Sequence, residues 1–220
     1  MGSFRAKALG ELERKAAGLP WNDLVAPGTE PEFAVTCRKS RLYHSGAVAE
    51  RLAKAARAVC DDRRRGAADR RSPHPTGVPA TARFVVRILR DVVTIRANSS
   101  GEHLHRRGYR QAIAKAPLRE TLAAGVLRLV GWTPERPLVD PLCGSGTFVI
   151  EAALRACRRA PGENRHFGFE RWPGADPDLL RRLRAEALAR LRPPPAPLEG
   201  SDRDEGAVGA ATANAERAGV

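Results

Sequence analysis

The stretch LVDPLCGSGTFVIEAAL, residues 138–154, decides the fold predicted for this chain. It opens with a short apolar segment that ends at Asp140, and from Phe148 onward it is apolar in the manner of a buried helix. Between these two parts lies a turn that contains Gly144 and Gly146. Glycine adopts backbone conformations with positive φ and leaves room for a ligand beside the backbone. The stretch therefore predicts a strand, a ligand-binding turn and a helix.

Helices and strands alternate through the rest of the C-terminal half. The first expected element is a helix from Pro117 to Gly131, in which Leu118, Leu122, Val126 and Leu129 or Val130 recur at helical spacing. A second helix is opened by Asp176-Pro177, with Leu180, Leu183, Ala187 and Leu191 facing inward. A strand over 198–201 and a helix over 204–217 follow. This alternation favours a parallel, Rossmann-like sheet. Two parallel strands cannot bury both faces of a sheet well. We therefore expect the chain to be truncated, or a partner or the N-terminal residues to cover the sheet.

The pattern of the N-terminal half predicts a small α/β unit. Residues 33–37 have the pattern of a short strand, and 47–59 carry one apolar stripe at helical spacing. Residues 61–81 are charged and rich in proline and glycine, which predicts a loop. Residues 83–98 read as two strands around a turn at Arg90-Asp91, which predicts a β-hairpin.

Charge indicates the class of partner. The chain has 38 lysine and arginine residues against 25 aspartate and glutamate residues, a net charge of +13, and almost all of the cations are arginine. Arginine binds phosphate bidentately, so a nucleic-acid partner is one explanation and a GC-rich coding sequence is the other. No apolar run approaches the ~18 residues of a membrane span, which disfavours a membrane protein. Four scattered cysteines without a CxxC pair fit a reducing cytoplasm and no zinc site.

Three classes of ligand compete for the glycine turn. A phosphate-binding P-loop requires a lysine that is absent here, and a dinucleotide fingerprint requires a third glycine where Val149 stands. S-adenosylmethionine remains, and its cationic groups suit the carboxylate of Asp140. A second carboxylate, Asp202, follows the next expected strand, where it could accept hydrogen bonds from ribose hydroxyls. The alternative for Asp202 is a helix N-cap or a surface turn.

Several motifs resemble one known family, the THUMP-containing RNA guanine-N2 methyltransferases, and most closely its bacterial branch that modifies large-subunit ribosomal RNA. The resemblance rests on LHRRGYR (104–110), APLRETLAAGVL (116–127), DPLCGSGTFVIEAAL (140–154), APG (160–162), FGFERWP (167–173) and GSDRDEGAVGAATANAERAGV (200–220). Upstream, WNDL (21–24), FAVTCRKSRLYHSG (33–46) and RFVVRILRDVVTIRANSSGEHL (83–104) resemble the later part of a THUMP domain. The likeness covers nearly the whole chain.

The resemblance implies a partial THUMP-like RNA-binding domain over 1–98 and the first half of a class I methyltransferase domain over 99–220. It implies methyl transfer from S-adenosylmethionine to the N2 amine of a guanine, in ribosomal rather than transfer RNA. The residues expected at the cofactor are Asp140, Cys143, Gly144, Ser145, Gly146, Thr147 and Asp202. We expect Cys143 to be a packing residue, because no histidine lies nearby in sequence to activate its thiol.

Two basic clusters are candidates for RNA phosphate contacts. They are Lys39, Arg41 and His44 after the first expected strand, and Arg106, Arg107 and Arg110 near the domain junction. The alternative for both is a solvated basic surface. Glu120 and Glu151 lie within expected helices, where capping or salt bridges are the ordinary role of a carboxylate.

The sequence departs from the family at the catalytic motif. The family carries an Asn-Pro-Pro-Tyr-type motif, which holds the target amine and stacks on the flipped base. The only similar run, Arg192-Pro193-Pro194-Pro195, lacks both the polar and the aromatic residue. We therefore expect no catalytic residue and no activity from this chain alone, with a missing C-terminal segment or a second polypeptide completing the domain. The alternatives are an RNA-binding module with a vestigial cofactor pocket, a transfer RNA guanine-N2 methyltransferase, and an enzyme that methylates DNA adenine or a small molecule.

Overall fold

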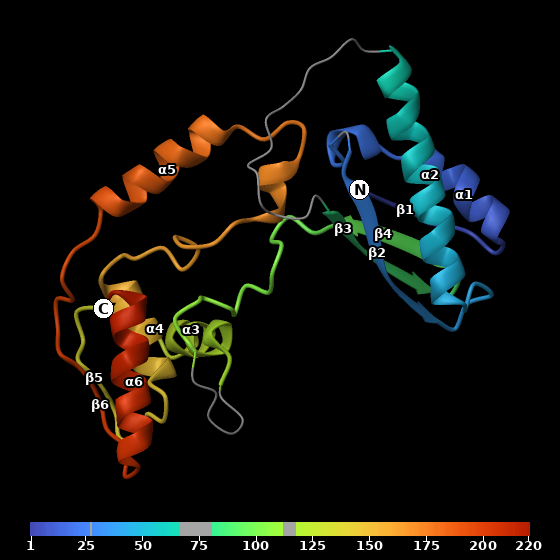
Figure 1. Cartoon of the computed structure of the whole chain (residues 1–220). Helices are drawn as coiled ribbons and strands as arrows, with labels where there is room; N and C mark the ends of the chain where they lie inside the picture. The colour runs from blue at the N-terminus through green and yellow to red at the C-terminus, as the bar shows by residue number, and fades with distance from the viewer. Residues whose placement is uncertain (27, 67–80, 112–117) are drawn as a thin grey trace. The chain divides into compact units, whose positions relative to one another are not determined.

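The chain folds as two compact units. The computed structural model describes residues 1–26, 28–66, 81–111 and 118–220 (Figure 1). The first unit contains residues 1–101 and 167–176, and the second contains 102–166 and 177–220. The predicted boundary after residue 98 lies close to the end of the first segment. The excursion of 167–176 back to the first unit was not predicted.

The first unit is built on a four-stranded sheet. Its strands are β1 (Gly2–Arg5), β2 (Glu30–Arg38), β3 (Thr81–Leu89) and β4 (Val92–Ala97), in the order β1-β4-β3-β2. β2 and β3 are parallel, and the other two pairs are antiparallel. The predicted hairpin is confirmed: Arg90 and Asp91 join β3 to β4 with φ of 50° and 62°. Positive φ at both turn residues matches the right-handed twist of the strands.

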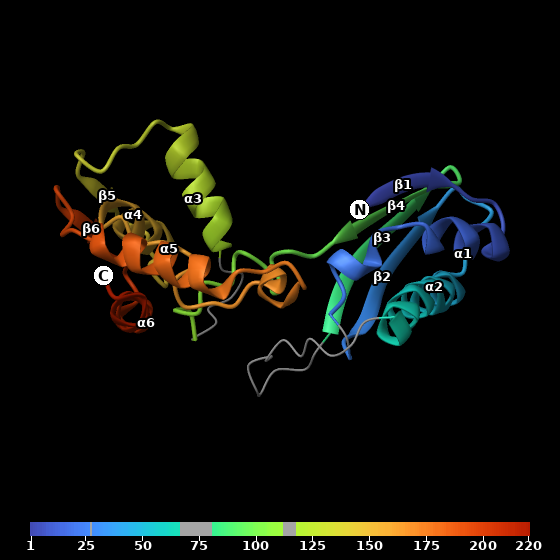
Figure 2. The same ribbon diagram turned by 90° about the horizontal axis from the view of Figure 1, so that it is seen from above.

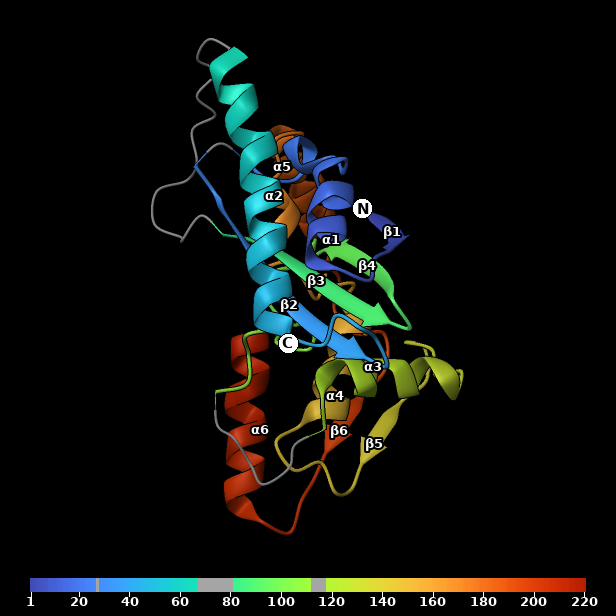
Figure 3. The ribbon, with the colours of Figure 1, turned by 90° about the vertical axis from the view of Figure 1, so that its right-hand side faces the viewer.

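Two helices, α1 (Leu9–Ala17) and α2 (Ser45–Gly66), cover one face of this sheet, as Figures 2 and 3 show. The predicted stripe of α2 is confirmed, because Val48, Leu52, Ala55 and Ala56 are buried in the core. The core also holds Phe84, Val86, Ile88, Val93 and Ile95 from the strands. The predicted loop over 61–81 is wrong at its start, where α2 continues through Gly66. The rest of that prediction, residues 67–80, lies outside the described residues.

Two short 3-10 helices complete the first unit. η1 (Trp21–Asp23) places Trp21 in the core, where its indole ring packs nearly perpendicular to the rings of Phe33 and Phe84. η2 (Gly168–Arg171) belongs to the returning segment, and the N–H of Phe169 donates to the Ser99 carbonyl at 3.1 Å. This segment therefore docks where the chain leaves β4.

The second unit contains the predicted strand–turn–helix. Its elements are α3 (Glu120–Leu129), β5 (Leu138–Asp140), α4 (Thr147–Ala156), α5 (Pro177–Ala189), β6 (Leu198–Gly200) and α6 (Glu205–Ala218). β5 and β6 are parallel, with Leu138 opposite Leu198 and Asp140 opposite Gly200. The prediction of parallel strands joined through helices is confirmed. Because the carboxyl ends of parallel strands lie at the same edge, the turn after β5 meets the residues after β6.

The apolar stripe predicted for α3 does not match the buried face of that helix. α3 buries Glu120, Ala123 and Leu127, whereas Leu122, Val126, Leu129 and Val130 are exposed. The helix is oriented by α4, its main neighbour, and by the ion pair that Glu120 forms. α5 has no fully buried residue. Of the residues predicted to face inward, Leu180, Ala187 and Leu191 are half-buried, and Leu183 is exposed. The predicted helix start at Pro117 lies outside the described residues.

Among the residues that the structure describes, no helix combines the length and apolar character needed to cross a membrane. Within the same residues, no three histidine, cysteine, aspartate or glutamate side chains are grouped so as to hold a metal ion.

Candidate cofactor site

The turn between β5 and α4 depends on two glycines in the left-handed region. Gly144 has φ of 52° and Gly146 has φ of 82°. The Gly146 N–H donates to the Cys143 carbonyl at 2.8 Å, and the Gly146 carbonyl accepts from Ile150 at 2.8 Å as α4 begins. A β-carbon on Gly146 would lie 3.0 Å from Cβ of Ala211 in α6. Gly146 thus permits both the tight turn and the close approach of α6.

The residues after β6 are hydrogen-bonded to this turn. The N–H of Cys143 donates to the Ser201 carbonyl, and the N–H of Ser201 donates to the Asp140 carbonyl, each at 2.9 Å. The Gly144 N–H donates to Oδ2 of Asp202, 58 residues along the chain, at 2.9 Å. The structure therefore brings together the two carboxylates that sequence reasoning assigned to one site.

Asp202 is held as a carboxylate. Its Oδ1 accepts from the N–H of Asp204 at 3.1 Å and its Oδ2 accepts from Gly144. These two backbone hydrogen bonds hold the pKa of Asp202 below its ordinary value, because they stabilise the ionised form. The N-cap of α6 is Asp204, whose carboxylate accepts from Gly206 and Ala207. Asp202 is therefore not the N-cap, and each of its oxygens keeps a lone pair for a further donor.

The outer side of the turn is open at Gly144. A β-carbon there would meet no atom within 4 Å, whereas one on Gly200 would lie 3.1 Å from Cβ of Cys143. Asp140, at the end of β5, accepts from the N–H of Leu142 at 3.1 Å. The turn thus presents bare backbone between the carboxylates of Asp140 and Asp202. This arrangement fits a ligand with cationic groups and hydroxyls, such as S-adenosylmethionine, and it repels phosphate.

Cys143 packs beneath the turn. Its side chain is buried against Gly200, and burial raises the pKa of the thiol. Since only the thiolate is a strong nucleophile, this environment suits a packing residue. Ser145 and Thr147 are also buried. The Ser145 carbonyl accepts a hydrogen bond from Nδ2 of Asn214 at 3.1 Å. The Thr147 hydroxyl accepts one from Nη2 of Arg110 at 2.6 Å.

Asn214 is a structural residue of the site that sequence reasoning missed. It lies in α6 and has no exposed surface. Besides donating to Ser145, it accepts from Nη2 of Arg217 at 2.5 Å, and Nε of Arg217 donates to the Tyr109 carbonyl at 2.7 Å. The sequence could have indicated Asn214, because an amide on the inner side of an alanine-rich helix must be buried and must therefore have hydrogen-bond partners.

A buried polar cluster lies next to the turn. Glu151, in α4, accepts from Nε and Nη2 of Arg107 at 3.3 and 3.2 Å, and from the Tyr109 hydroxyl at 3.2 Å. Burial raises the pKa of the Glu151 carboxyl, and the hydrogen bonds from Arg107 and Tyr109 oppose that rise. Burial also raises the pKa of Tyr109, so its phenol stays protonated and donates. Arg110 forms the second ion pair, 3.6 Å from Glu120.

These contacts change the interpretation of the junction arginines. Arg107 and Arg110 are largely buried and are already paired with carboxylates, so their position argues against the predicted phosphate contacts. Arg106 is exposed and pairs with Glu102 at 3.3 Å. The predicted salt bridges of Glu120 and Glu151 are confirmed.

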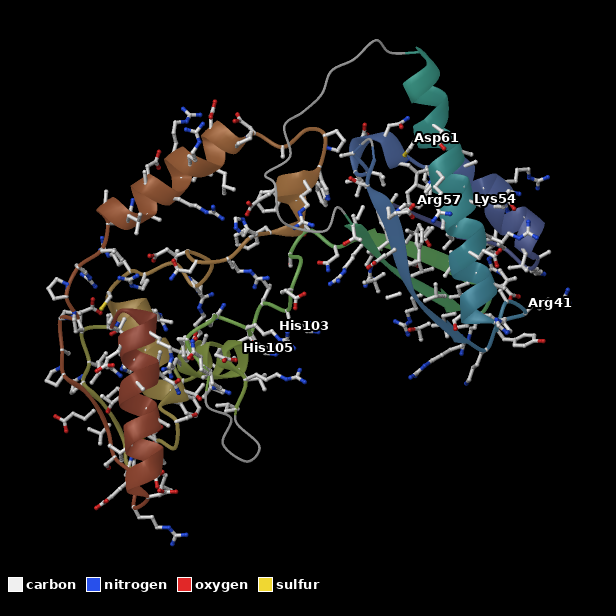
Figure 4. The ribbon with its side chains drawn as sticks, in the orientation of Figure 1. Arg41, Lys54, Arg57, Asp61, His103 and His105 are labelled. Atoms are coloured by element: carbon white, nitrogen blue, oxygen red, sulfur yellow. The ribbon has the colours of Figure 1, made fainter. Side chains whose placement is uncertain are left out.

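The predicted basic cluster of the first unit is exposed. Lys39, Arg41 and His44 lie at the end of β2 and in the segment that follows it. Figure 4 shows Arg41 in the connection between β2 and α2. In the second unit, the rings of His103 and His105 stack with centroids 5.4 Å apart (Figure 4). Sequence reasoning placed these histidines in a loop, and no helix or strand contains them.

Comparisons with known proteins agree with this geometry. Residues 107–220 match UPF0020, the RMKL-like methyltransferase domain. Over 219 residues the chain is 37% identical to "Putative RNA methyltransferase slr0064" of Synechocystis sp., with 99% of this chain and 56% of that protein covered.

Solved structures show the same fold. The structure of a "predicted N6-adenine-specific DNA methylase" from Listeria monocytogenes has a TM-score of 0.85 and 36% identity, covering 99% of this chain and 56% of that one. SMU.472, "a putative methyltransferase complexed with SAH", has a TM-score of 0.85 and 32% identity, covering 99% and 57%. The predicted α/β fold with a Rossmann-like methyltransferase unit is confirmed. The chain spans little more than half the length of these relatives.

Proposed function

Because the chain belongs to the UPF0020 family of RMKL-like methyltransferase domains, we propose that its second unit binds S-adenosylmethionine and forms the cofactor half of an RNA methyltransferase. The observation that carries this proposal is the open backbone of Gly144 beside the carboxylate of Asp202. When bound, S-adenosylmethionine supplies an electrophilic methyl group. Within this site the Asp202 carboxylate accepts hydrogen bonds from the ribose hydroxyls, and the Asp140 carboxylate attracts the cationic part of the ligand.

The substrate we propose is the N2 amine of a guanine in RNA, ribosomal rather than transfer RNA. The name of the Synechocystis relative supports RNA, and the net charge of +13 suits a polyanion. The family resemblance described above supports guanine N2. In the same proposal the first unit is a partial THUMP-like RNA-binding domain. The name of the Listeria relative points instead to adenine in DNA, so both substrates belong in the assay.

We also propose that a further stretch of polypeptide, either a C-terminal segment or a second chain, completes the methyltransferase sheet. Val139 and Leu142, at and after β5, are 65% and 78% exposed, and Leu129 on α3 is 87% exposed. Apolar surface of this kind is stabilised by a covering element. The relatives are nearly twice as long as this chain, which leaves room for such an element and for the missing catalytic motif. By itself the chain transfers no methyl group.

The cofactor proposal is tested by calorimetric titration of the full chain with S-adenosylmethionine, S-adenosylhomocysteine and, as a phosphate-bearing control, ATP. We expect the first two to bind and ATP not to bind. Asp202→Asn should weaken binding about 10- to 100-fold, since a hydrogen bond to a charged group contributes about 1.5–3 kcal/mol. Glu199→Gln, which removes the same charge from β6 on an exposed side chain, is the matched control.

Glycine variants test the same site independently. Gly144→Ala places a methyl group in the open space of the proposed pocket and should weaken binding at least tenfold. Gly131→Ala has the same backbone penalty, because Gly131 has φ of 68° and also faces open space, but it should leave binding unchanged. Absence of S-adenosylmethionine binding, or equal effects of the two variants, would support the vestigial pocket instead.

Methyl transfer is tested with tritiated S-adenosylmethionine and unmodified ribosomal RNA, transfer RNA and DNA. The chain alone should give no label in any of them. Robust turnover would contradict the proposal that another segment carries the catalytic motif, and analysis of the labelled nucleoside would then distinguish guanine from adenine.

A further inference from the structure

Among the described residues of the first unit, no α-helix covers the second face of its sheet. Side chains alternate across a strand, so the helices that bury Phe84, Val86 and Ile88 leave the intervening residues of β3 on the other face. By this alternation the other face consists of Ser3, Arg5, Glu30, Glu32, Ala34, Thr36, Arg38, Thr81, Arg83, Val85, Arg87, Leu89, Val92, Thr94 and Arg96. Its two carboxylates are already paired, Glu32 with Arg83 and Glu30 with Arg57 of α2. η2, which contacts β3, lies next to Asn98, at the end of the sheet opposite to the β3–β4 turn.

The strand register brings arginines and hydroxyls of this face together. Thr36 of β2 lies opposite Arg87 of β3, which lies opposite Thr94 of β4. The Thr94 hydroxyl is 3.3 Å from that of Ser3 in β1. The neighbouring row pairs Val85 with Arg96. A row of this kind spans four strands at about 4.8 Å per strand, a length that suits contact with successive nucleotides.

A cationic hollow continues this face at the β3–β4 turn. Its volume is about 480 Å³, and it is lined by Arg38, Lys39, Arg87, Leu89 and Arg90. Lys39 and Arg90 both have positive φ, at 47° and 50°. The hollow therefore gathers four cations where β2 and β3 end.

These cations differ from the basic residues of α2 that are paired with carboxylates. Lys54 of α2 pairs with Glu13 of α1 at 2.8 Å, and Arg57 of α2 pairs with Glu30 of β2 at 2.6 Å; Figure 4 labels Lys54 and Arg57. Within the described part of the chain, no ion pair involves the side chains of Arg5, Arg38, Lys39, Arg87, Arg90 or Arg96. Concentrated like charge that outnumbers its carboxylates destabilises the free protein, so an anionic partner stabilises this face.

We propose that this open sheet face binds the phosphate backbone of an RNA strand. Arginine forks bind phosphate oxygens bidentately, and the hydroxyls of Thr36 and Thr94 can donate to phosphate or to the ribose 2′-OH. Val85 is 49% exposed among the arginines and offers an apolar contact to a sugar or base. The mixture of arginine, hydroxyl and apolar groups favours RNA over an acidic protein segment. The choice of RNA as partner rests on the proposed function.

The test is fluorescence anisotropy of the full chain with a fluorescein-labelled single-stranded RNA of about 20 nucleotides, a length set by the ~4–16-nucleotide sites of single-strand binders. We expect Arg87→Glu and Arg96→Glu each to weaken binding at least tenfold. We also expect each to reduce the slope of log Kd against log salt by about 0.7, the value for one phosphate contact on a single strand. Arg14→Glu makes the same charge change on α1, across the sheet, and should alter Kd less than twofold.

If all three variants weaken RNA binding equally, the effect comes from net charge alone and the proposal is overturned. Unchanged RNA affinity in Arg87→Glu and Arg96→Glu would also overturn it. Displacement of the RNA by polyglutamate at equal charge concentration would assign the face to an acidic protein instead.

Calorimetry with S-adenosylmethionine on the same variants separates the RNA-binding proposal from the cofactor proposal. If the cofactor fails to bind but Arg87→Glu weakens RNA binding as expected, only the cofactor proposal fails. If the cofactor binds and RNA affinity is unchanged, only this one fails.

Discussion

Glu151 connects the segment before α3 to the helix that follows the glycine turn. Its carboxylate is almost fully buried and holds both Arg107 and Tyr109. Glu151→Ala would leave a buried guanidinium without its charge partner. Breaking a buried pair in this way costs about 3–5 kcal/mol. We expect a loss of about 3 kcal/mol in the free energy of unfolding of the second unit, measured by urea titration with hydrogen exchange at α4 amides.

The control for this prediction is Glu186→Ala on α5. Glu186 forms an exposed pair with Arg190 at 4.0 Å, and removing such a pair changes stability by about 0–1 kcal/mol. If both variants lose the same small amount, the Glu151 cluster does not hold the unit together.

Asp202 provides a prediction about pH. Hydrogen bonds from Asp204 and Gly144 lower the pKa of its carboxyl below 3.8, the ordinary value. The group thus contributes stability above its unfolded pKa, and this contribution is lost as the pH falls through the lower, folded value. A carboxyl-carbon NMR titration should give a midpoint below 3.8 for Asp202, and Asp202→Asn should remove that resonance. A midpoint at or above this value would mean that the bond to Gly144 does not form.

At the scale of elements, the packing of α6 on the glycine turn explains how two segments far apart in sequence form one site. Gly146 approaches Ala211 and Ile150, and Asn214 donates to the carbonyl next to Gly146. The exposed side of α3 has no such neighbour among the described residues of its unit. The difference shows why helical spacing alone did not identify the buried face of α3.

Gly146→Ala tests the close approach of α6. At positive φ, alanine costs about 1–2 kcal/mol at any site, and here the new methyl group would also lie 3.0 Å from Ala211. Gly131→Ala has the first cost only, since nothing lies within 4 Å. We expect Gly146→Ala to destabilise the second unit by about 1–3 kcal/mol more than Gly131→Ala, as measured by hydrogen exchange in α6. Equal losses would mean that α6 does not depend on this contact.

At the scale of the whole molecule, the two units differ in how much apolar surface they bury. Among the described residues, the first unit packs a single large cluster that includes Trp21, Phe84 and Leu52, whereas the second divides its buried apolar residues between two small clusters. Burial of apolar surface is the main stabilising contribution to folding. The first unit should therefore be the more stable one.

Hydrogen exchange on the full chain tests this difference. Amides of β3 and β4 should exchange more slowly than those of β5 and β6. S-adenosylmethionine at about 100 times its Kd should add about 2.7 kcal/mol of protection to the second unit only. Protection that spreads equally over both units would contradict their independence, and faster exchange in β3 than in β5 would contradict the ranking of their stabilities.

The sequence by itself determined the second unit's order of elements, the glycine turn and the position of Asp140 and Asp202 at one edge of the sheet, beside that turn. These features follow from local periodicity, from glycine's freedom at positive φ and from the shared edge of parallel strands. It did not reveal β1 and α1, because β1 is only four residues long and α1 has few apolar positions.

Only the tertiary structure decided the role of the junction arginines and the buried face of α3. Arg107 looks like any surface arginine in sequence, yet its carboxylate partner Glu151 lies 44 residues away and removes it from solvent. The register of four strands likewise brought Thr36, Arg87 and Thr94 into one row. Charge and burial depend on neighbours in space, and the chain's own order does not contain those neighbours.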